Sequence, residues 1–381
     1  MAKKGRANNG MGSIRQRSDG RWEARYTAPN GKQKSVYGKS EAEVTKKLRG
    51  VLHEIDSGAW REPSKMTISE WLDIWVSDYL THASERTVLK YKCIVDGQLK
   101  PTVGTVKVSK LAPYHVQRMI TTMVNNGLKQ CTVSNYIKIF LSAMNCAVDA
   151  GIITENPVKR AKVPRVPPAK FTIIDRTDIP AFFEAAKKTP YEYELRFMIL
   201  TGLRIGEVRG LRWDDIDFDS GTLHVQRQLH PKDRNLSRFT PPKYGEDRII
   251  YLPSDAVAIL KDQKRRQAEQ RIARGADWYE DEISTDLVFR QRNGKAHGQK
   301  TIYNAVKNVG IAIGKPDLHP HDLRHSYAVA ALRSGTDVKT VQHNLGHKTA
   351  GMTLDVYASY TSDAGKEGAN KLSQYFKNAE K

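Results

Sequence analysis

Residues 158–170 divide the chain into parts that must fold separately. The segment is basic and rich in proline, and it has no helical or strand periodicity; its charged and proline residues include Lys159, Arg160, Lys162, Pro164, Arg165, Pro167 and Pro168. Such a composition favours an extended linker, either a solvated hinge or a strap along a phosphate backbone. A shorter linker with Gly58 and Pro63 spans 58–65. The sequence therefore predicts three domains, 1–57, 66–157 and 171–381.

Residues 13–57 have the pattern of a small three-stranded sheet followed by a helix. Turn signals at 18–20 and 29–31 flank a stretch in which apolar and charged residues alternate, and Ser40 to Glu43 forms a capping box. Arg21, Arg25 and Tyr37 are expected on the face that the helix leaves open. Two interpretations remain: a generic module with solvated charges, or a basic sheet that enters a major groove through these three residues.

Helical periodicity dominates from residue 66 to 157. A capping box at Thr67–Glu70 opens the first helix, and later helices are expected at 84–99, 113–126 and 132–150. The Trp and Met residues of this region are predicted to be core rather than a binding platform. The chain has three cysteines without paired spacing, which predicts neither a disulfide framework nor a zinc site. Cys131 and Cys146 are predicted to be buried thiols in helices.

From Phe171 onward the pattern is mixed. Helices are expected near 176–188, 191–202, 206–212 and 254–273, strands at 223–225 and 248–252, and further helices within 301–359. The tail beyond Tyr360 has apolar residues at helical spacing. Together the patterns predict a multidomain α+β protein. It has an N-terminal sheet with a helix, a helical second domain, and a mainly helical third domain with a small antiparallel sheet.

The charge balance indicates a polyanionic partner. The formal net charge is +20 and the pI about 9.7, which makes nucleic acid the first candidate. The N-terminus is basic and lacks an apolar run, and no stretch is long and apolar enough to span a membrane. The expected location is the cytoplasm, with association to the nucleoid in a bacterial host.

Two motifs suggest metal sites that the surrounding residues disfavour. His321 and His325 have the i, i+4 spacing of a zinc protease, but Asp322 stands in place of the required Glu, and Arg324 adds a cation. The acidic run 214–219 alternates with apolar residues before a glycine, which is more typical of a turn entering a strand than of a two-metal site. No metal and no other cofactor is predicted.

An ordered set of residues instead suits phosphodiester chemistry without a metal. Two arginines can clamp the phosphate oxygens, a tyrosine can attack phosphorus, and a lysine on a turn can protonate the leaving oxygen. The candidates, in chain order, are Arg204, Lys243, His321, Arg324, His347 and Tyr357. Each residue alone is a weak signal, and the order and spacing make the set specific.

This set resembles the tyrosine recombinase, or phage integrase, family, particularly the integrases of temperate phages and integrative conjugative elements. The matching segments are Thr201–Glu207, Lys243 before Arg248–Pro253, His321–His325, Leu345–His347 and Thr353–Tyr357. The resemblance implies an arm-binding N-terminal sheet, a helical core-binding domain and a catalytic domain. It also implies a homotetramer on double-stranded DNA, with an excisionase and a host DNA-bending protein as further partners.

The resemblance also assigns roles to the residues. Tyr357 would form a 3′-phosphotyrosyl bond and release a 5′-hydroxyl, with Lys243 as general acid and His321 assisting proton transfer. Arg204, Arg324 and His347 would bind the phosphate. Glu207 would buttress the first arginine, and His325 would be structural. Tyr360 is a second candidate nucleophile. Two alternatives to an integrase remain: a type IB topoisomerase-like nicking enzyme, and a non-catalytic DNA-binding regulator.

Overall fold

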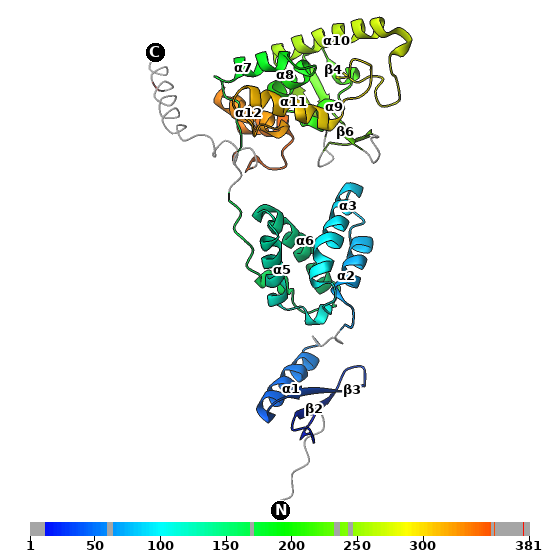
Figure 1. Cartoon of the computed structure of the whole chain (residues 1–381), viewed down its shortest axis with the longest axis vertical. Helices are drawn as coiled ribbons and strands as arrows, with labels where there is room; N and C mark the ends of the chain where they lie inside the picture. Colours follow the sequence, from blue (N-terminus) through cyan, green and yellow to red (C-terminus); the bar gives the residue numbers. More distant parts are fainter. Residues whose placement is uncertain are drawn as a thin grey trace, which may run out of the picture. The chain divides into compact units, whose positions relative to one another are not determined.

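The computed structural model describes residues 12–58, 64–167, 171–231, 237–242 and 247–351, together with Leu354 and Phe376. The chain divides into two compact units, Met1–Pro168 and Ala169–Lys381 (Figure 1). The boundary falls in the basic, proline-rich segment that the sequence marks as a linker. Within the described ranges, no helix is long and apolar enough to cross a membrane.

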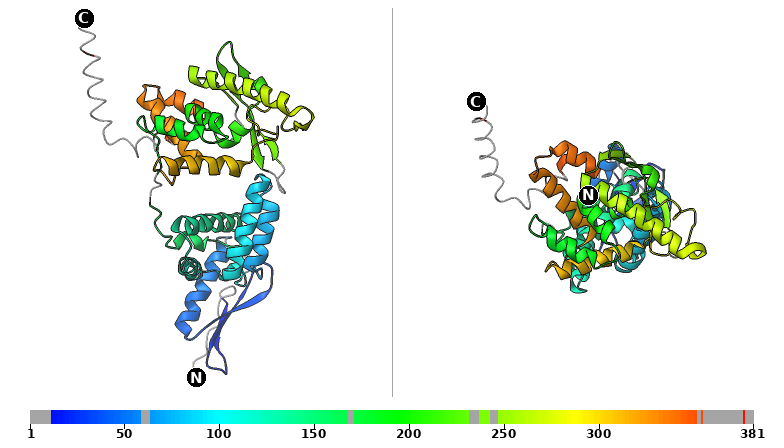
Figure 2. Two further views of the ribbon diagram at one scale, coloured as in Figure 1. Left: turned by 45° about the horizontal axis from the view of Figure 1, so that its top comes forward. Right: turned by 90° about the horizontal axis from the view of Figure 1, so that it is seen from above.

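The N-terminal unit begins with an antiparallel sheet in the order β1 (Ser13–Gln16), β2 (Trp22–Thr27), β3 (Gln33–Gly38). Helix α1 (Glu41–Asp56) follows, and Figure 2 shows it beside the sheet. The Ser40 side chain accepts a hydrogen bond from Glu43 N, so the predicted cap is present. The alternating residues Ala24 and Tyr26 of β2 pack against Val44 and Leu48 of α1 in a small core of their own. The side chains of Arg25 and Tyr37 lie on the other face of the sheet, where both bond to Glu23.

Five helical segments follow in the same unit. They are α2 (Ile68–Ile74), which continues as a π-helical turn, α3 (Glu85–Ile94), which does the same, α4 (Lys100–Val103), α5 (Pro113–Asn125) and α6 (Gln130–Asp149). The predicted capping box at Thr67–Glu70 is confirmed. Trp71 and Trp75 are buried, and the Trp71 indole donates a hydrogen bond to the Ala143 carbonyl at 3.0 Å. The tryptophans are therefore core residues, as predicted.

The prediction of buried thiols was wrong for Cys131 and only partly right for Cys146. Cys131 is exposed, and Cys146 is partly buried at the edge of the core. The buried side of α6 begins at Val133 and continues through Ile137. Cys131 precedes Val133 by two residues, which is more than half a helical turn, so its side chain points away from the core.

The C-terminal unit is mainly helical around two small sheets. Its helices are α7 (Ile179–Lys187), α8 (Glu192–Thr201), α9 (Ile205–Arg209), α10 (Ser254–Arg274), α11 (Gln299–Ala312), α12 (Pro320–Arg333) and α13 (Val338–Leu345). Strands β4 (Ile216–Asp217), β5 (Thr222–Val225) and β8 (Arg248–Tyr251) form one antiparallel sheet, and β6 (Gln228–Pro231) pairs with β7 (Ser237–Thr240) in a hairpin. The predicted α+β class is confirmed, while the separate hairpin was not predicted.

Two helix ends in the C-terminal unit are shaped by glycine. Helix α8 is buried on most sides, packs against α10 and α12, and ends at Gly202, whose φ is 65° (Figure 1). A Cβ at Gly202 would lie 2.4 Å from the Tyr327 ring, so a larger residue would clash as well as strain the backbone. Helix α13 ends in the same way at Gly346, with φ 61°. These two ends lie next to the residues of the candidate site.

Candidate active site

The start of α12 presents the motif 321–325. His319 caps the helix with Pro320 in its first turn, and the fully buried Asp322 accepts a hydrogen bond from His319 N at 3.1 Å. Burial raises the pKa of Asp322, and its carboxylate also contacts the His319 ring. Because Asp322 fixes the cap, its neighbours are held in place: His321 is exposed, and Arg324 points inward.

Arg324 joins two helix ends. Its side chain is 2% exposed; Nη1 donates to the Gly202 carbonyl at 3.0 Å, and Nη2 donates to the Leu345 carbonyl. Helix C-termini leave such carbonyls without intrahelical partners, so a cation is well placed there. Burial, and then the charge of Arg204, lowers the pKa of Arg324 to about 9. The guanidinium is therefore still charged at pH 7.

Arg204 lies at the N-cap of α9 and is oriented by Glu207. Its backbone N donates to Glu207 Oε2 at 2.9 Å, its Nη1 donates to Glu207 Oε1 at 2.8 Å, and its Nη2 donates to the Gly346 carbonyl at 2.8 Å. Burial opposes ionisation of Glu207, but the hydrogen bonds and charges of Arg248 and Arg204 outweigh it and keep its pKa below the usual value. The structure thus places Glu207 as the buttress of Arg204.

Arg248 is a member of this cluster that the sequence analysis treated only as a strand residue. It is 6% exposed, and its guanidinium contacts Glu207 and the Asn344 carbonyl. The sequence held a signal for the burial of Arg248, because strand alternation places it on the same buried face as Ile250. A buried arginine needs a carboxylate partner, but the sequence did not say which one.

The histidines of the site differ in exposure and in what they contact. His347 follows Gly346, and burial, followed by the charges of Arg324 and Arg204, lowers its pKa to about 3. His325 packs against Phe171, with ring centroids 4.2 Å apart, and burial lowers its pKa to about 4. Both rings are therefore neutral at pH 7 before any phosphate binds. The ring of exposed His321 lies edge-on to that of His325.

A pocket of about 400 Å³ lies where these elements meet. Arg204, at the start of α9, and His321 and Arg324, both on α12, line it from two separate segments of the chain. The remaining lining residues are Leu203, Ile205, Gly206, Gln228, His230, Gln299, Tyr303, His319 and Pro320. Two guanidinium groups and an imidazole around one open space suit a phosphodiester.

Lys243 and Tyr357 lie outside the described residues, as does Tyr360. The described chain on either side of Lys243 is anchored: the Gln228 side chain donates to the Pro241 carbonyl at 2.6 Å, and His224 is paired with Asp247 at 2.6 Å. The roles of Lys243, Tyr357 and Tyr360 stay predictions.

On the N-terminal sheet, two of the three predicted contact residues, Arg25 and Tyr37, bond to a carboxylate that the local sequence pattern did not single out. Glu23 is 2% exposed and accepts hydrogen bonds from Arg15, Arg25, Ser35 and Tyr37 at 2.7 to 3.4 Å. Ser35 and Arg15 bonds, opposed by burial, lower the pKa of Glu23 to about 2. Arg21 lies just before β2 and pairs with Asp19. Arg25 and Tyr37 therefore share one face, and Arg21 lies beside it.

The motifs that suggested metal sites have other partners. Asp215, from the acidic run, pairs with Arg227 at 2.7 Å and accepts a hydrogen bond from Gln226 at 2.7 Å. In the parts of the chain that the structure describes, no three His, Cys, Asp or Glu side chains are grouped as metal ligands would be.

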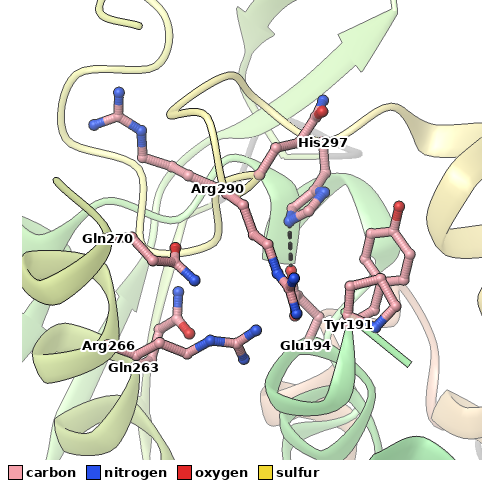
Figure 3. Close-up of a pocket in the computed structure, with 10 residues that line it drawn as sticks. Tyr191, Glu194, Gln263, Arg266, Gln270, Arg290 and His297 are labelled. Atoms are coloured by element: carbon pink, nitrogen blue, oxygen red, sulfur yellow. Dashed lines mark ion pairs between the residues drawn. The ribbon is translucent and has the colours of Figure 1, made fainter. Parts of the chain in front are cut away.

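A second pocket, of about 180 Å³, is lined by residues of α8, α10 and the segment 290–297 (Figure 3). His297 pairs there with Glu194 at 2.7 Å. Arg290 donates to the carbonyls of Gly294, Thr285 and Tyr279, so its donors are engaged within the protein. Arg204, His321, Arg324 and His347, the candidate catalytic residues that the structure describes, do not line this pocket. Its polar groups bond to other parts of the fold, and we place the candidate site in the pocket lined by Arg204, His321 and Arg324.

Comparison with known proteins shows to which family the chain belongs. Residues 173–363 match the model of the phage integrase family, and residues 67–124 match the model of the phage integrase N-terminal SAM-like domain. The chain belongs to the phage integrase family. The resemblance inferred from the ordered motifs is thereby confirmed.

Other members of the integrase family match over most of the chain. The tyrosine recombinase XerC-like protein of Caldanaerobacter subterraneus subsp. tengcongensis is 26% identical over 355 residues, which are 86% of this chain and 88% of that protein. The integrase of transposon Tn1549, solved in complex with a circular intermediate DNA, superposes with a TM-score of 0.69 and 18% identity, over 81% of this chain and 100% of that one. A chain of the lambda integrase tetramer bound to a Holliday junction superposes with a TM-score of 0.54 and 18% identity, over 88% of this chain and 96% of that one. The fold is that of a tyrosine recombinase.

Proposed function

We propose that the protein is a site-specific DNA recombinase that integrates and excises a mobile element or prophage. The observation that carries the proposal is the convergence of Arg204, His321 and Arg324 on one pocket. These residues come from segments more than a hundred positions apart, and both arginines are charged and oriented by carbonyl or carboxylate partners. Such an arrangement is expected where a phosphate must be held and its developing charge stabilised.

The proposed reaction exchanges one phosphodiester bond for another. The Tyr357 hydroxyl attacks the scissile phosphorus and forms a 3′-phosphotyrosyl bond, and the bond to the 5′-oxygen breaks. Lys243 gives its proton to that oxygen, which leaves as a 5′-hydroxyl. A 5′-hydroxyl from the partner strand then attacks the phosphotyrosine, and the tyrosine leaves with its proton restored. The bond energy is conserved, so no nucleotide cofactor is needed.

The histidines of the site have two proposed roles in this scheme, proton transfer and hydrogen bonding to the phosphate. His321 is exposed at the pocket and is proposed to take the proton from the Tyr357 hydroxyl. His347, which follows the carbonyl held by Arg204, is proposed to donate a hydrogen bond to a phosphate oxygen. A ring with a pKa of about 3 is neutral at pH 7 and still carries one N–H, which can donate to that oxygen.

The domains predicted from the sequence, 1–57, 66–157 and 171–381, are proposed to divide DNA recognition. Residues 1–57 would bind an arm site through Arg21, Arg25 and Tyr37, and residues 66–157 would bind the core site. The Tn1549 and lambda integrases were solved with DNA, the latter as a tetramer on a Holliday junction. Both complexes support binding to double-stranded DNA, and the lambda complex supports a tetramer. An excisionase and a host DNA-bending protein remain proposed partners.

The test is covalent trapping. The protein is incubated with a nicked suicide substrate that carries the junction sequence of its element, and the products are resolved on a denaturing gel. The wild-type chain should yield a protein–DNA adduct, and Arg324→Gln should reduce its rate roughly 10²–10³-fold, the usual loss for one donor to a transition-state oxyanion. Binding without any adduct would favour the regulator. Relaxation of supercoiled DNA without strand exchange would favour the topoisomerase-like enzyme.

A further inference from the structure

We infer that Arg248 is a positioning residue of the proposed active site. It does not line the pocket, yet it contacts both the carboxylate that orients Arg204 and the helix end that precedes His347. The inference rests on the proposed function, because it concerns how the phosphate clamp of that same site is kept in place.

The first contact is a two-point ion pair with Glu207. Arg248 Nη1 lies 3.2 Å from Glu207 Oε1, and Nη2 lies 2.9 Å from Oε2. The side chains are 5% and 0% exposed, so water does not replace either partner. A paired geometry of this kind fixes the plane of the carboxylate. Since Glu207 also accepts two hydrogen bonds from Arg204, fixing Glu207 fixes Arg204.

The second contact completes a row of three carbonyls, each held by a different arginine. Arg248 Nε donates to the Asn344 carbonyl at 2.8 Å, Arg324 donates to the Leu345 carbonyl, and Arg204 donates to the Gly346 carbonyl at 2.8 Å. These carbonyls form the C-terminal end of α13, which orphan acceptors and the helix dipole make favourable for cations. His347 follows directly, so the same row sets where its ring lies.

Gly346 allows this close approach. A Cβ at Gly346 would lie 3.0 Å from Arg248 Nη1, and the backbone there has φ 61°. A side chain at this position would strain the turn and displace the guanidinium. The requirement for glycine before His347 therefore has a steric partner in Arg248.

Charge gives Arg248 a role beyond packing. The guanidinium groups of Arg204, Arg248 and Arg324 face one carboxylate, Glu207, so the cluster keeps two positive charges for a phosphate. Without Arg248, the buried Glu207 would have Arg204 as its remaining close cation. Arg204 would then be drawn toward Glu207 and be less available to the phosphate, and the field at the pocket would fall.

The experiment compares Arg248→Met, Arg248→Lys and the double variant Arg248→Met with Glu207→Gln in the full chain. Single-turnover adduct formation is measured at saturating protein, with DNA affinity measured separately. Arg248→Met should slow adduct formation by roughly 10- to 100-fold, less than loss of a direct oxyanion donor, and leave DNA affinity within about threefold. Arg248→Lys should recover part of the rate. The double variant should be faster than Arg248→Met, because it removes the carboxylate charge that would otherwise draw Arg204 away from the phosphate.

A second substrate separates charge from folding. A methylphosphonate at the scissile position carries no negative charge, so the penalty of Arg248→Met should shrink at least about tenfold on it. The matched control is Arg209→Met. Arg209 is also buried, at 3% exposed, but it donates to the carbonyls of His297 and Leu229 rather than to a carboxylate. Its loss should lower the melting temperature and slow both substrates alike.

The outcomes are distinct. If the wild-type chain forms no adduct, the proposed function fails and the role of Arg248 in it falls too. If the wild-type chain cleaves and Arg248→Met cleaves within about twofold of it, Arg248 does not position the site. If the double variant is slower than Arg248→Met and both substrates lose equally, Arg248 acts only on folding, and the inference is overturned.

Discussion

Replacing His325 with leucine should remove much of the acid sensitivity of the C-terminal unit. His325 is 7% exposed and packs between Phe171 and His321. Burial, followed by the electrostatic effects of His321 and Arg324, lowers its pKa from 6.5 to about 4. The unfolded chain therefore binds a proton between pH 6.5 and pH 4 that the folded chain does not. Stability from this group is present above pH 6.5 and is lost as the pH falls toward 4.

The magnitude follows from the size of the pKa difference. Between pH 7 and pH 5, one such histidine lowers the free energy of unfolding by roughly 2 kcal/mol. For a unit of about two hundred residues, that corresponds to a melting temperature lower by about 4–8 °C. His347, whose pKa is lowered to about 3, acts in the same direction. Leucine fills a similar volume and cannot titrate, so the variant should lose less on acidification.

Scanning calorimetry of the wild-type chain, His325→Leu and His347→Gln at pH 7, 6 and 5 provides the measurement. Between pH 7 and pH 5, the melting temperature of the C-terminal unit should fall less in each variant than in the wild type. It should fall least in the double variant that combines His325→Leu with His347→Gln. If wild type and His325→Leu lose the same number of degrees between pH 7 and pH 5, the buried ring is not held neutral. The electrostatic description of the site would then be wrong.

Three further predictions concern function. Adduct formation should survive excess EDTA, because arginine and lysine supply the charge that a metal would and histidine supplies hydrogen bonds; loss that Mg²⁺ or Zn²⁺ restores would contradict this. Lys243→Ala should slow cleavage roughly 10²–10⁴-fold, and a 5′-bridging sulfur, which leaves without a proton, should restore the rate; an absence of rescue would make Lys243 a phosphate contact. Deleting residues 1–57 should spare core-site cleavage and abolish recombination that needs arm sites, and the isolated fragment should bind DNA with an affinity that falls steeply with salt; normal recombination by the truncated chain would refute the arm assignment.

The sequence predicted the parts of the fold that local patterns specify. Thr67 and Glu70 predicted a capped helix, and the alternation around Ala24 predicted β2. Both patterns are visible in the sequence because capping and strand periodicity depend on neighbouring residues. The position of Cys131 was misjudged because its helix face depends on where the core lies.

The candidate site divides in the same way. Arg204 and Arg324 were identified because their motifs are local, and the structure brings them to one pocket. The role of Arg248 depends on Glu207 and Asn344, which are far from it in the chain and join it only through tertiary packing. The burial of Glu23 beneath Arg25 and Tyr37 was missed for the same reason, since it depends on the register of three strands.

The central claim is that this chain cuts DNA through a tyrosyl ester at Tyr357, and the most direct measurement is the identity of the residue bound to DNA. The adduct on a suicide substrate is digested with protease and nuclease, and the modified peptide is sequenced by mass spectrometry, with Tyr357→Phe and Tyr360→Phe as matched variants. The account predicts a nucleotide on Tyr357, no adduct but normal DNA binding in Tyr357→Phe, and cleavage retained in Tyr360→Phe. An adduct that persists in Tyr357→Phe, or a modified peptide with the nucleotide on Tyr360, would contradict it.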